Sequence, residues 1–332
     1  MRVVVADPPA FTPPYDHALA AALARAGAEV ELVTSRFRFG DAPEPDGYRR
    51  RELFYPLSSR LFGRSRLRVP LKVVEHPLGL ARLAATKADV VHVQWLALPE
   101  ADAWLLRHRA PLVLTAHDLL PRRTAAKTAL WRRAFGRFER IVVHSERGRE
   151  TLAAFGVPEE KLRVIPHPVT PGDTARADDG RTVLALGLVR PYKQLEHARR
   201  AATAAGAALR VAGDANAFLS EAEIDSALAE STVAVFPYRP ELDQSGALLR
   251  ALGAGLPAVV YDVGGLAEPV RGFGAGRVVA PDDVDGLGAA LRELLDDDGA
   301  LAEARAGALR ARAELTWDAA AQAHLDLYRE LT

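Results

Sequence analysis

Short apolar runs alternate with alanine- and leucine-rich helical stretches along all 332 residues, and this alternation restricts the fold more than any other feature. The runs lack a polar residue at every second position, which is typical of parallel strands buried on both faces. Two doubly wound α/β domains with Rossmann-like parallel sheets, facing each other across a cleft, are therefore the predicted fold. The predicted strands are 2–6, 30–34, 89–95, 111–117 and 140–145, then 182–188, 208–213, 232–238, 257–262 and 276–280.

A stretch rich in Pro, Asp and Gly, residues 166–182, interrupts the alternation and is the best linker candidate. We expect an N-terminal domain over 1–167 and a C-terminal domain over 168–315. The closing segment, 316–332, reads as a helix that begins at an N-cap threonine. We expect this helix to pack back on the N-terminal domain.

Composition narrows the function. The 43 basic and 43 acidic residues cancel, so no net field draws the chain to nucleic acid. The absence of cysteine excludes disulfides, thiolate metal sites and a cysteine nucleophile. A signal-peptide core and an apolar run of about 18 residues are also missing, so we expect a cytoplasmic protein.

Familiar nucleotide-binding motifs are missing as well. The first glycine, Gly27, comes well after the first strand, so the dinucleotide fingerprint G-x-G-x-x-G is absent. None of the five lysines follows a glycine, which excludes a P-loop. No G-x-S-x-G, H-E-x-x-H or other close ligand cluster indicates a hydrolase elbow or a metal.

A pair of cations carries the first chemical signal that remains. Arg190 and Lys193 directly follow the strand 182–188, and the carboxyl ends of parallel strands face the ligand crevice of a doubly wound domain. An arginine fork and a mobile lysine charge both suit phosphate oxygens. An ordinary solvated loop is the alternative.

The start of a predicted helix carries the second signal. Ser245 opens this helix, and the small residues Gly246 and Ala247 follow it. Small residues at a helix start leave backbone N–H groups accessible, which suits a phosphate. A plain serine cap is the alternative.

Seven segments follow one another in a fixed order over nearly the whole chain. They are ALAAALARAGAEVELVT (18–34), ADVVHVQW (88–95), LVLTAHDLLP (112–121), IVVHSERGRETLAAFGVPEEKLRVIPHPV (141–169), LGLVRPYKQLE (186–196), VFPYRPELDQSGALLRALGAGLPAVVYDVGGLAEPV (235–270) and TWDAAAQAHLDLY (316–328). In this order they resemble the GT-B glycosyltransferases of the large retaining group called family 4.

The resemblance implies where the donor binds. Basic residues after the first strand of the second domain hold the donor pyrophosphate in the family, and Arg190 and Lys193 occupy that place. Leu188 stands where many members have an arginine. The backbone amides of Ser245, Gly246 and Ala247 match the loop that meets the donor phosphates. A histidine beside the donor sugar and reaction centre is matched by His117, for which a core histidine at a strand end is the alternative.

The chain also departs from the family. Many members carry two glutamates eight residues apart, one on the donor sugar and one on the ribose, where Leu242 and Arg250 stand here. Between 215 and 220 the chain lacks the helix and strand that usually adjoin the base. The residues left as candidates for the donor sugar and nucleotide are Glu241, Asp243, Gln244, Asn216 and Glu268.

The implied reaction is transfer of a sugar from a nucleotide-diphosphate sugar to a hydroxyl, with anomeric retention and without a metal or cofactor. The acceptor would be a saccharide or a lipid-linked hydroxyl. Two alternatives stay open: a GT-B nucleotide-sugar epimerase, and a non-catalytic sugar-nucleotide-binding relative. The lost glutamate pair favours the non-catalytic relative, whereas the retained His117, Arg190 and Lys193 oppose it.

The acceptor side should lie in the N-terminal domain. Asp16, as the N-cap of the first helix, and His17 and Asp118 are its candidate residues. Segment 48–72 mixes many cations with aromatic and apolar residues, and only Glu52 offsets them. Such a mixture suits an anionic membrane surface, so the segment predicts peripheral association with the inner face of a membrane. A solvated face whose aromatics pack inward is the alternative, and no nucleic-acid motif accompanies the charges.

Overall fold

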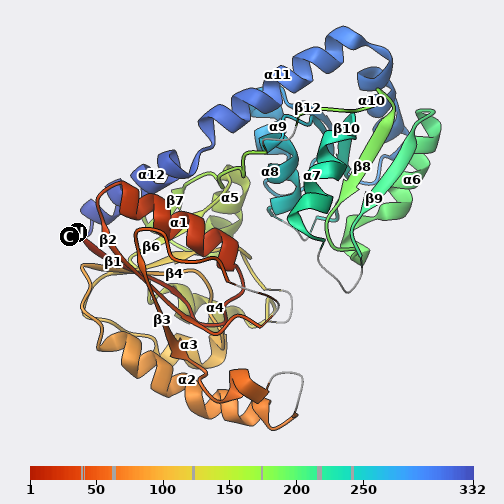
Figure 1. Cartoon of the computed structure of the whole chain (residues 1–332). Helices are drawn as coiled ribbons and strands as arrows, with labels where there is room; N and C mark the ends of the chain where they lie inside the picture. Colours follow the sequence, from red (N-terminus) through yellow and green to blue (C-terminus); the bar gives the residue numbers. More distant parts are fainter. Residues whose placement is uncertain are drawn as a thin grey trace. The chain divides into compact units, whose positions relative to one another are not determined.

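The computed structural model describes residues 1–38, 40, 42–61, 65–121, 124–172, 175–214, 219–240 and 243–332. It divides into two compact units, unit 1 with Met1–Ile165 and Trp317–Thr332, and unit 2 with Pro166–Thr316. Each unit is a parallel sheet covered by helices on both faces (Figure 1). The predicted fold class, two Rossmann-like domains, is thereby confirmed.

Unit 1 contains a seven-stranded sheet in the order β3-β2-β1-β4-β5-β6-β7. The chain order reverses between β1 and β4, which makes their carboxyl ends the switch point where doubly wound domains bind ligands. The strands are β1 (Arg2–Asp7), β2 (Glu29–Ser35), β3 (Arg49–Phe54), β4 (Val90–Val93), β5 (Leu112–Thr115), β6 (Arg140–Val143) and β7 (Leu162–Val164).

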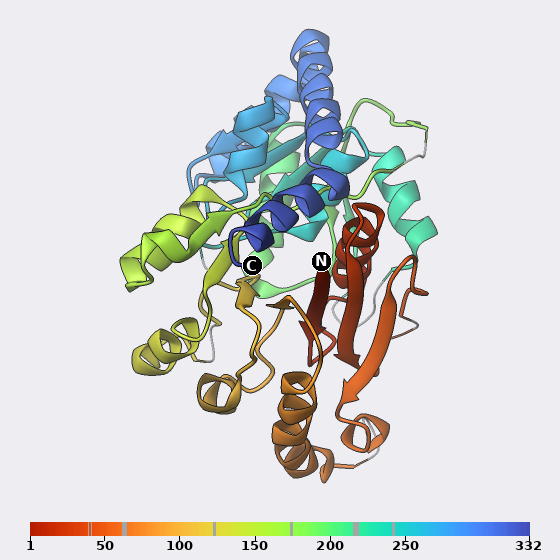
Figure 2. The same ribbon diagram turned by 90° about the vertical axis from the view of Figure 1, so that its left-hand side faces the viewer.

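Helices bury two separate apolar cores on the two faces of this sheet (Figure 2). Helices α1 (Pro13–Arg25) and α12 (Trp317–Arg329) contact each other over one face. Buried His92 of β4 holds α12, because its Nδ1 lies 2.6 Å from the Tyr328 hydroxyl. The other helices of unit 1 are α2 (Arg68–Ala84), α3 (Pro99–Leu105), α4 (Thr128–Phe135) and α5 (Glu146–Phe155), with the short 3-10 turns η1 (Ser58–Leu61) and η2 (Glu159–Lys161).

Unit 2 contains a five-stranded sheet in the order β12-β11-β10-β8-β9, and its switch point lies between β8 and β10. Its strands are β8 (Thr182–Leu186), β9 (Ala208–Ala212), β10 (Val233–Phe236), β11 (Ala258–Tyr261) and β12 (Gly276–Val279). Its helices are α6 (Leu195–Ala204), α7 (Glu221–Ala229), α8 (Gly246–Gly253), α9 (Ala267–Phe273), α10 (Val284–Asp296) and α11 (Asp298–Glu314), with the 3-10 turn η3 (Pro191–Lys193).

Segment 48–72 differs from its prediction at its beginning. Residues 49–54 form β3, which pairs in parallel with β2. Arg49 lies 3.1 Å from Glu29, and Arg51 lies 2.9 Å from Glu31, so these two cations are neutralised on the sheet. Phe54 is buried in the core. The run of three arginines concealed a strand, and two of these arginines find partners on the neighbouring strand.

The start of α1 also differs from its prediction. Thr12 is the residue that precedes the helix, and Asp16 lies inside it and is buried. Asp16 is therefore not an N-cap. Among the helices that the structure describes, none combines the length and the apolar composition needed to cross a bilayer.

Candidate functional site

Lys193 lies at the switch point of unit 2. Gly187 follows β8 with a φ of +92°, and η3 then brings Lys193 back over the strand end. There the ammonium donates a 2.8 Å hydrogen bond to the carbonyl oxygen of Leu186. A Cβ on Gly187 would lie 2.8 Å from Lys193 Nζ and 3.6 Å from the Cβ of Ala247. The bare glycine thus leaves room for the lysine beside the start of α8.

Burial opposes the charge of Lys193, whose side chain is only 7% exposed. A cation–π contact offsets part of this, because the Nζ lies 5.4 Å from the centre of the Tyr238 ring. Burial, and secondarily the positive charge of Arg190, lower the pKa of Lys193 to about 8. Within the described residues no carboxylate forms an ion pair with this ammonium. A bound anion would therefore supply the opposite charge that this lysine needs.

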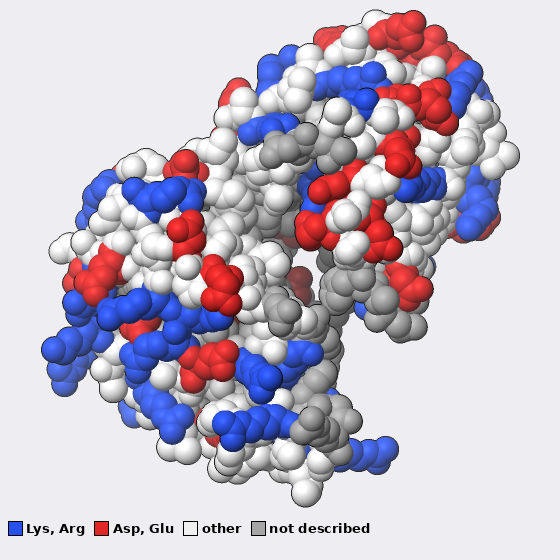
Figure 3. Space-filling view, in the orientation of Figure 1, with Lys and Arg blue, Asp and Glu red and all other residues white. Residues whose placement is uncertain are grey.

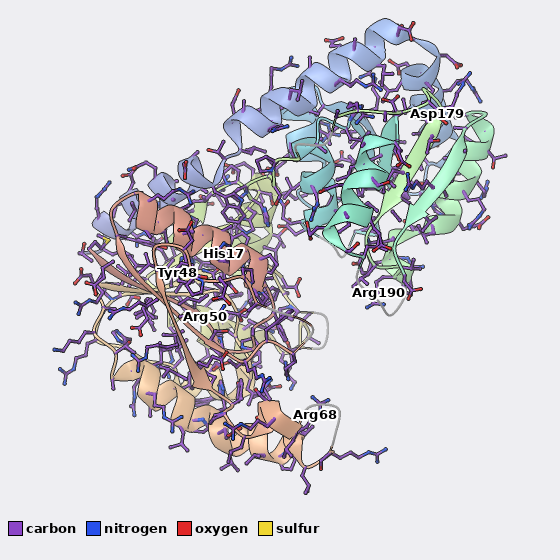
Figure 4. The ribbon with its side chains drawn as sticks, viewed as in Figure 1. His17, Tyr48, Arg50, Arg68, Asp179 and Arg190 are labelled. Carbon is purple, nitrogen blue, oxygen red and sulfur yellow. The ribbon has the colours of Figure 1, made fainter. Side chains whose placement is uncertain are left out.

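Arg190 reaches the same end of the sheet from a more exposed position. It follows β8, and Figure 4 shows it at the opposite end of the unit 2 sheet from Asp179, which precedes that strand. Its guanidinium donates to the carbonyl oxygen of Val189 at 3.3 Å. The guanidinium of Arg190 is therefore exposed to solvent, whereas the ammonium of Lys193 is buried.

Helix α8 begins beside these cations. The Ser245 hydroxyl accepts a 3.2 Å hydrogen bond from the backbone N–H of Leu248, so the serine does cap the helix. The N–H groups of the first turn of any α-helix have no partner within the helix, and the helix dipole makes that end positive. Gly246 is exposed and Ala247 half-buried in this first turn. The cap and a phosphate cradle are therefore compatible at the same helix start.

Other donor-side candidates lie on the loop after β10 and at the start of α9, which follows β11. Asp243 is buried, and its carbonyl oxygen accepts from Gly265 N–H at 2.7 Å. Gln244 is half-buried before α8, and Glu268 is half-buried in the first turn of α9. Three residues of the sequence prediction lie outside the described residues: Asn216, Glu241 and Leu242.

Arg250, at the position where many family members have the ribose glutamate, points to another helix. Its guanidinium pairs with Glu221 and, at 3.2 Å, with Asp225, both on α7. The pairing satisfies the positive charge within unit 2. At this position the chain therefore has an ion pair between α8 and α7.

His117 follows β5 and lies in an aromatic cluster at the carboxyl edge of the unit 1 sheet. Its Nε2 lies 3.0 Å from Gln94 Oε1, and its ring stacks on Trp95 with centroids 5.0 Å apart. The ring of Tyr15 meets His117 edge-on at 4.7 Å, and His144 lies 5.3 Å away. These contacts fix the imidazole plane at the carboxyl edge of the sheet, where His117 is half-buried.

Two buried carboxyl groups stand beside this cluster. Asp7 ends β1, and its Oδ2 accepts hydrogen bonds from Phe11 N–H at 2.7 Å and Thr12 N–H at 3.2 Å. Burial raises the pKa of Asp7, and burial with the charge of Asp7 raises the pKa of Asp16 well above its usual value. Because two adjacent carboxylates cannot both ionise cheaply, the pair shares a proton.

A small pocket in unit 1 contains two of the three predicted acceptor-side residues. Asp16 and His17 line it together with Tyr48 and Arg50. His17 Nδ1 lies 3.0 Å from the Tyr48 hydroxyl, and Arg50 donates to the carbonyl oxygen of Pro43 at 2.6 Å. Figure 4 labels His17, Tyr48 and Arg50 in unit 1. Asp118 is exposed and does not line this pocket.

Sequence reasoning missed several residues of the unit 1 edge, which come from separate strands. Gln94, Trp95 and His144 share one signal, because each stands just after a strand, in VVHVQW and VVHS. In the described part of the chain, no group of three or more His, Asp or Glu side chains could hold a metal ion. The missed residues are Tyr15, Tyr48, Arg50, Gln94, Trp95 and His144.

Two family models match the chain, Glycosyltransferase Family 4 over residues 15–173 and Glycosyl transferases group 1 over residues 181–297. The chain belongs to the family 4 glycosyltransferases. The family resemblance drawn from the sequence is confirmed.

Solved structures agree with this fold. The glycosyltransferase has a TM-score of 0.76 to sucrose-phosphate synthase from Thermosynechococcus elongatus, at 19% identity over 100% of this chain and 99% of that one. It has a TM-score of 0.70 to Anabaena HepE in complex with UDP-glucose, at 16% identity over 100% of both chains. A glycogen synthase of Mycobacterium tuberculosis is 43% identical over 82 residues, 24% of this chain and 20% of that protein. The chain spans about a fifth of the length of the curated relatives it matches.

Proposed function

We propose that this glycosyltransferase moves a sugar from a nucleotide-diphosphate sugar to a hydroxyl acceptor and retains the anomeric configuration. The observation that carries the proposal is Lys193, a buried cation with a lowered pKa beside the start of α8. A diphosphate placed there would meet the ammonium, the Arg190 fork and the amides of Gly246 and Ala247. The structural likeness to HepE, which was solved with UDP-glucose, supports a donor of this class.

The proposed catalysis is electrostatic. Negative charge gathers on the diphosphate as the bond to the sugar breaks, and preorganised cations and backbone amides stabilise that charge. The bound anion would raise the pKa of Lys193 and keep it protonated at neutral pH. In this proposal no metal or cofactor takes part, because the protein supplies the positive charge itself.

Retention would follow from substitution on one face of the sugar. The bond from the anomeric carbon to the leaving phosphate breaks, and the acceptor oxygen bonds to the same face. The acceptor proton passes to the departing phosphate. We assign His117 to the donor sugar, the role that the resemblance implies, and its rigid attachment to Gln94 and Trp95 supports such positioning. Asp243, Gln244 and Glu268 are the proposed contacts of the sugar hydroxyls and the nucleotide.

We place the acceptor at the pocket of Asp16, His17 and Tyr48. A neutral carboxyl, an imidazole and a phenol can all donate to and accept from hydroxyl groups. This chemistry suits a saccharide, and it equally suits the hydroxyl of a lipid-linked acceptor. Asp118, exposed after β5, is the remaining acceptor-side candidate.

Thermal unfolding with UDP-, GDP-, ADP- and dTDP-sugars tests the donor assignment. A ligand at about 100 times its Kd stabilises the folded state by about 2.7 kcal/mol, so the true donor should raise the melting temperature clearly. No shift with any of the four would contradict the proposal.

The nature of the product separates the remaining functions. With the donor that binds, NMR of the product anomeric proton should show retained configuration in a new glycoside. Conversion of the donor to its epimer without transfer would indicate a GT-B epimerase. Binding without turnover over a panel of saccharide and lipid-linked acceptors would favour a non-catalytic relative.

A further inference from the structure

Helix α2 turns two of its ionisable side chains, Glu75 and His76, inward. Glu75 is buried, and its two carboxylate oxygens accept from Leu57 N–H at 2.8 Å and Ser58 N–H at 3.0 Å. The adjacent His76 bridges the Tyr55 hydroxyl and the Asp102 carboxylate, at 2.6 Å each. Glu75 and His76 thus find their polar partners on the inner side of α2.

The outer side of α2 is apolar and exposed to solvent. Val74 is 66% exposed, and Leu67, just before the helix, is 70% exposed. Prolines 70 and 77 and Ala81 are exposed on the same helix. A surface helix normally places these residue types toward the core. The large exposed apolar residues of this segment are Leu67, Val69, Val73, Val74 and Leu78.

Helix α3 continues this surface. It contacts α2, and Figures 1 and 2 show both helices together at one end of unit 1. Trp104 of α3 is 60% exposed, with the Arg133 guanidinium 3.3 Å from the centre of its ring. Most of the large apolar side chains that the structure describes as exposed lie on α2 and α3 or immediately before them. Such concentration indicates an interaction site rather than scattered surface residues.

The charges on and just before α2 are predominantly basic, whereas α3 carries the exposed Glu100, which pairs with Lys127. Between Glu52 and Asp89 the sequence holds a single acid, the buried Glu75. In Figure 3, blue and white dominate over red around α2. Basic residues on and beside α2 include Arg60, Arg66, Arg68, Lys72 and Arg82.

We propose that the outer side of α2, together with Trp104 of α3, docks on an anionic lipid bilayer. We call it the docking face, formed by Leu67, Val69, Val73, Val74, Leu78 and Trp104. Its valines and leucines would enter the boundary between headgroups and acyl chains, and its flanking cations would meet lipid phosphates. An exposed tryptophan is the side chain that prefers this boundary.

The docking face replaces part of the surface that the sequence predicted. Two arginines of β3 are paired with glutamates on β2, and the aromatic residues Phe54 and Tyr55 are buried. The first part of segment 48–72 is therefore a sheet edge, and the apolar surface extends beyond residue 72 along α2. This inference goes beyond sugar transfer and holds for any donor or acceptor.

Vesicle flotation tests the proposal with the full chain. We expect the protein to float with phosphatidylcholine vesicles that contain about 30 mol% phosphatidylglycerol, at least about tenfold more than with phosphatidylcholine alone, and less as salt rises. The double variant Val73→Asp/Val74→Asp should lower the partition coefficient at least about tenfold. The control Leu309→Asp, at a 52% exposed leucine on α11, should stay within about twofold.

Tryptophan fluorescence gives a local readout. Emission should shift to the blue with anionic vesicles, and Trp104→Phe should remove the shift. Unchanged melting and unchanged donor-induced stabilisation of the double variant would show that its fold and donor site are intact. If flotation persists in the folded double variant, or if the wild type does not float at low salt, the proposal is overturned. It is also overturned by a concentration-dependent dimer that the double variant abolishes, because a second copy would then cover the face.

Discussion

The carboxyl edges of the two sheets carry different side chains: cations in unit 2, and aromatic and carboxyl groups in unit 1. At the switch point of unit 2, Lys193 and Arg190 stand beside the positive end of α8. At the switch point of unit 1, His117 lies among aromatic rings beside Asp7 and Asp16. The topology sets where a ligand binds, and the residues after each strand set which ligand it is.

Burial shifts the pKa of an ionisable group at each edge in the direction that favours its neutral form. It lowers the pKa of Lys193 and raises the pKa of Asp16, so it moves both groups toward their neutral forms. A bound anion would raise the pKa of Lys193 again, whereas it would not remove the proton from Asp16. The positive charge of Lys193 would thus be reinforced when an anion binds, whereas burial favours the neutral form of Asp16.

Of the four variants considered, Lys193→Ala should have the largest effect, and it tests the anion site of unit 2. Loss of a preorganised cation at the leaving group is expected to reduce turnover about a hundredfold. Steady-state kinetics with the donor found by thermal shift would measure this. Lys87→Ala, at an exposed lysine of unit 1, is the matched control and should retain normal turnover. A Lys193→Ala enzyme of near-normal activity would remove Lys193 from the diphosphate site.

His117→Ala should affect the chemistry of unit 1 without affecting the anion site of unit 2. We expect kcat to fall about thirtyfold, with the donor Kd changed by less than about threefold. His108→Ala controls for the loss of a half-buried histidine, because His108 bonds to Thr86 away from the carboxyl edge. Equal losses in both variants would return His117 to a purely structural role.

Donor affinity should depend on pH through Lys193. With its pKa at about 8, most of the ammonium loses its proton between pH 7 and pH 9, and binding should weaken about tenfold. Calorimetry at both pH values measures this, and at pH 8 to 9 binding should take up protons. Lys193→Arg, if it still binds the donor, should flatten the profile, whereas the same decline in that variant would assign it to another group.

Asp16→Asn should give the smallest effect, on stability. Because the folded-state pKa of Asp16 is raised, its proton stabilises the folded state at low pH, and this contribution is lost as pH rises through the folded pKa. Asparagine does not titrate, so the variant should gain stability relative to the wild type between pH 4 and 8. Each pKa unit corresponds to about 1.4 kcal/mol, which denaturant unfolding resolves. A pH-independent difference would contradict the shared proton.

Sequence reasoning found the parts of the fold that follow from local pattern. Buried parallel strands read as apolar runs, and residues after neighbouring strands such as β8 and β10 meet at one edge, which is why Lys193 and Ala247 come together. Strand β3 was missed because its three arginines conceal the pattern, and the glutamates that pair with Arg49 and Arg51 lie on another strand.

Long-range packing decided the rest. The inward position of Tyr55 depends on His76, twenty-one residues later, and could not be read from segment 48–72 alone. The cluster around His117 draws on residues after β4 and β6 and in α1, so it required the strand order. The outer side of α2 was missed because only coordinates show which way a helix faces.

The return of the chain to unit 1 has a consequence for biosynthesis. Unit 2 is a continuous stretch, and near its ends Val169 N–H donates to the Leu315 carbonyl oxygen at 2.9 Å. Unit 1 needs α12, whose Leu325 and Tyr328 complete one of its two cores. On the ribosome, all of unit 2 emerges before α12 does. Until α12 has been synthesised, part of one apolar face of the unit 1 sheet therefore stays exposed in the nascent chain. A chaperone would bind unit 1 at this stage.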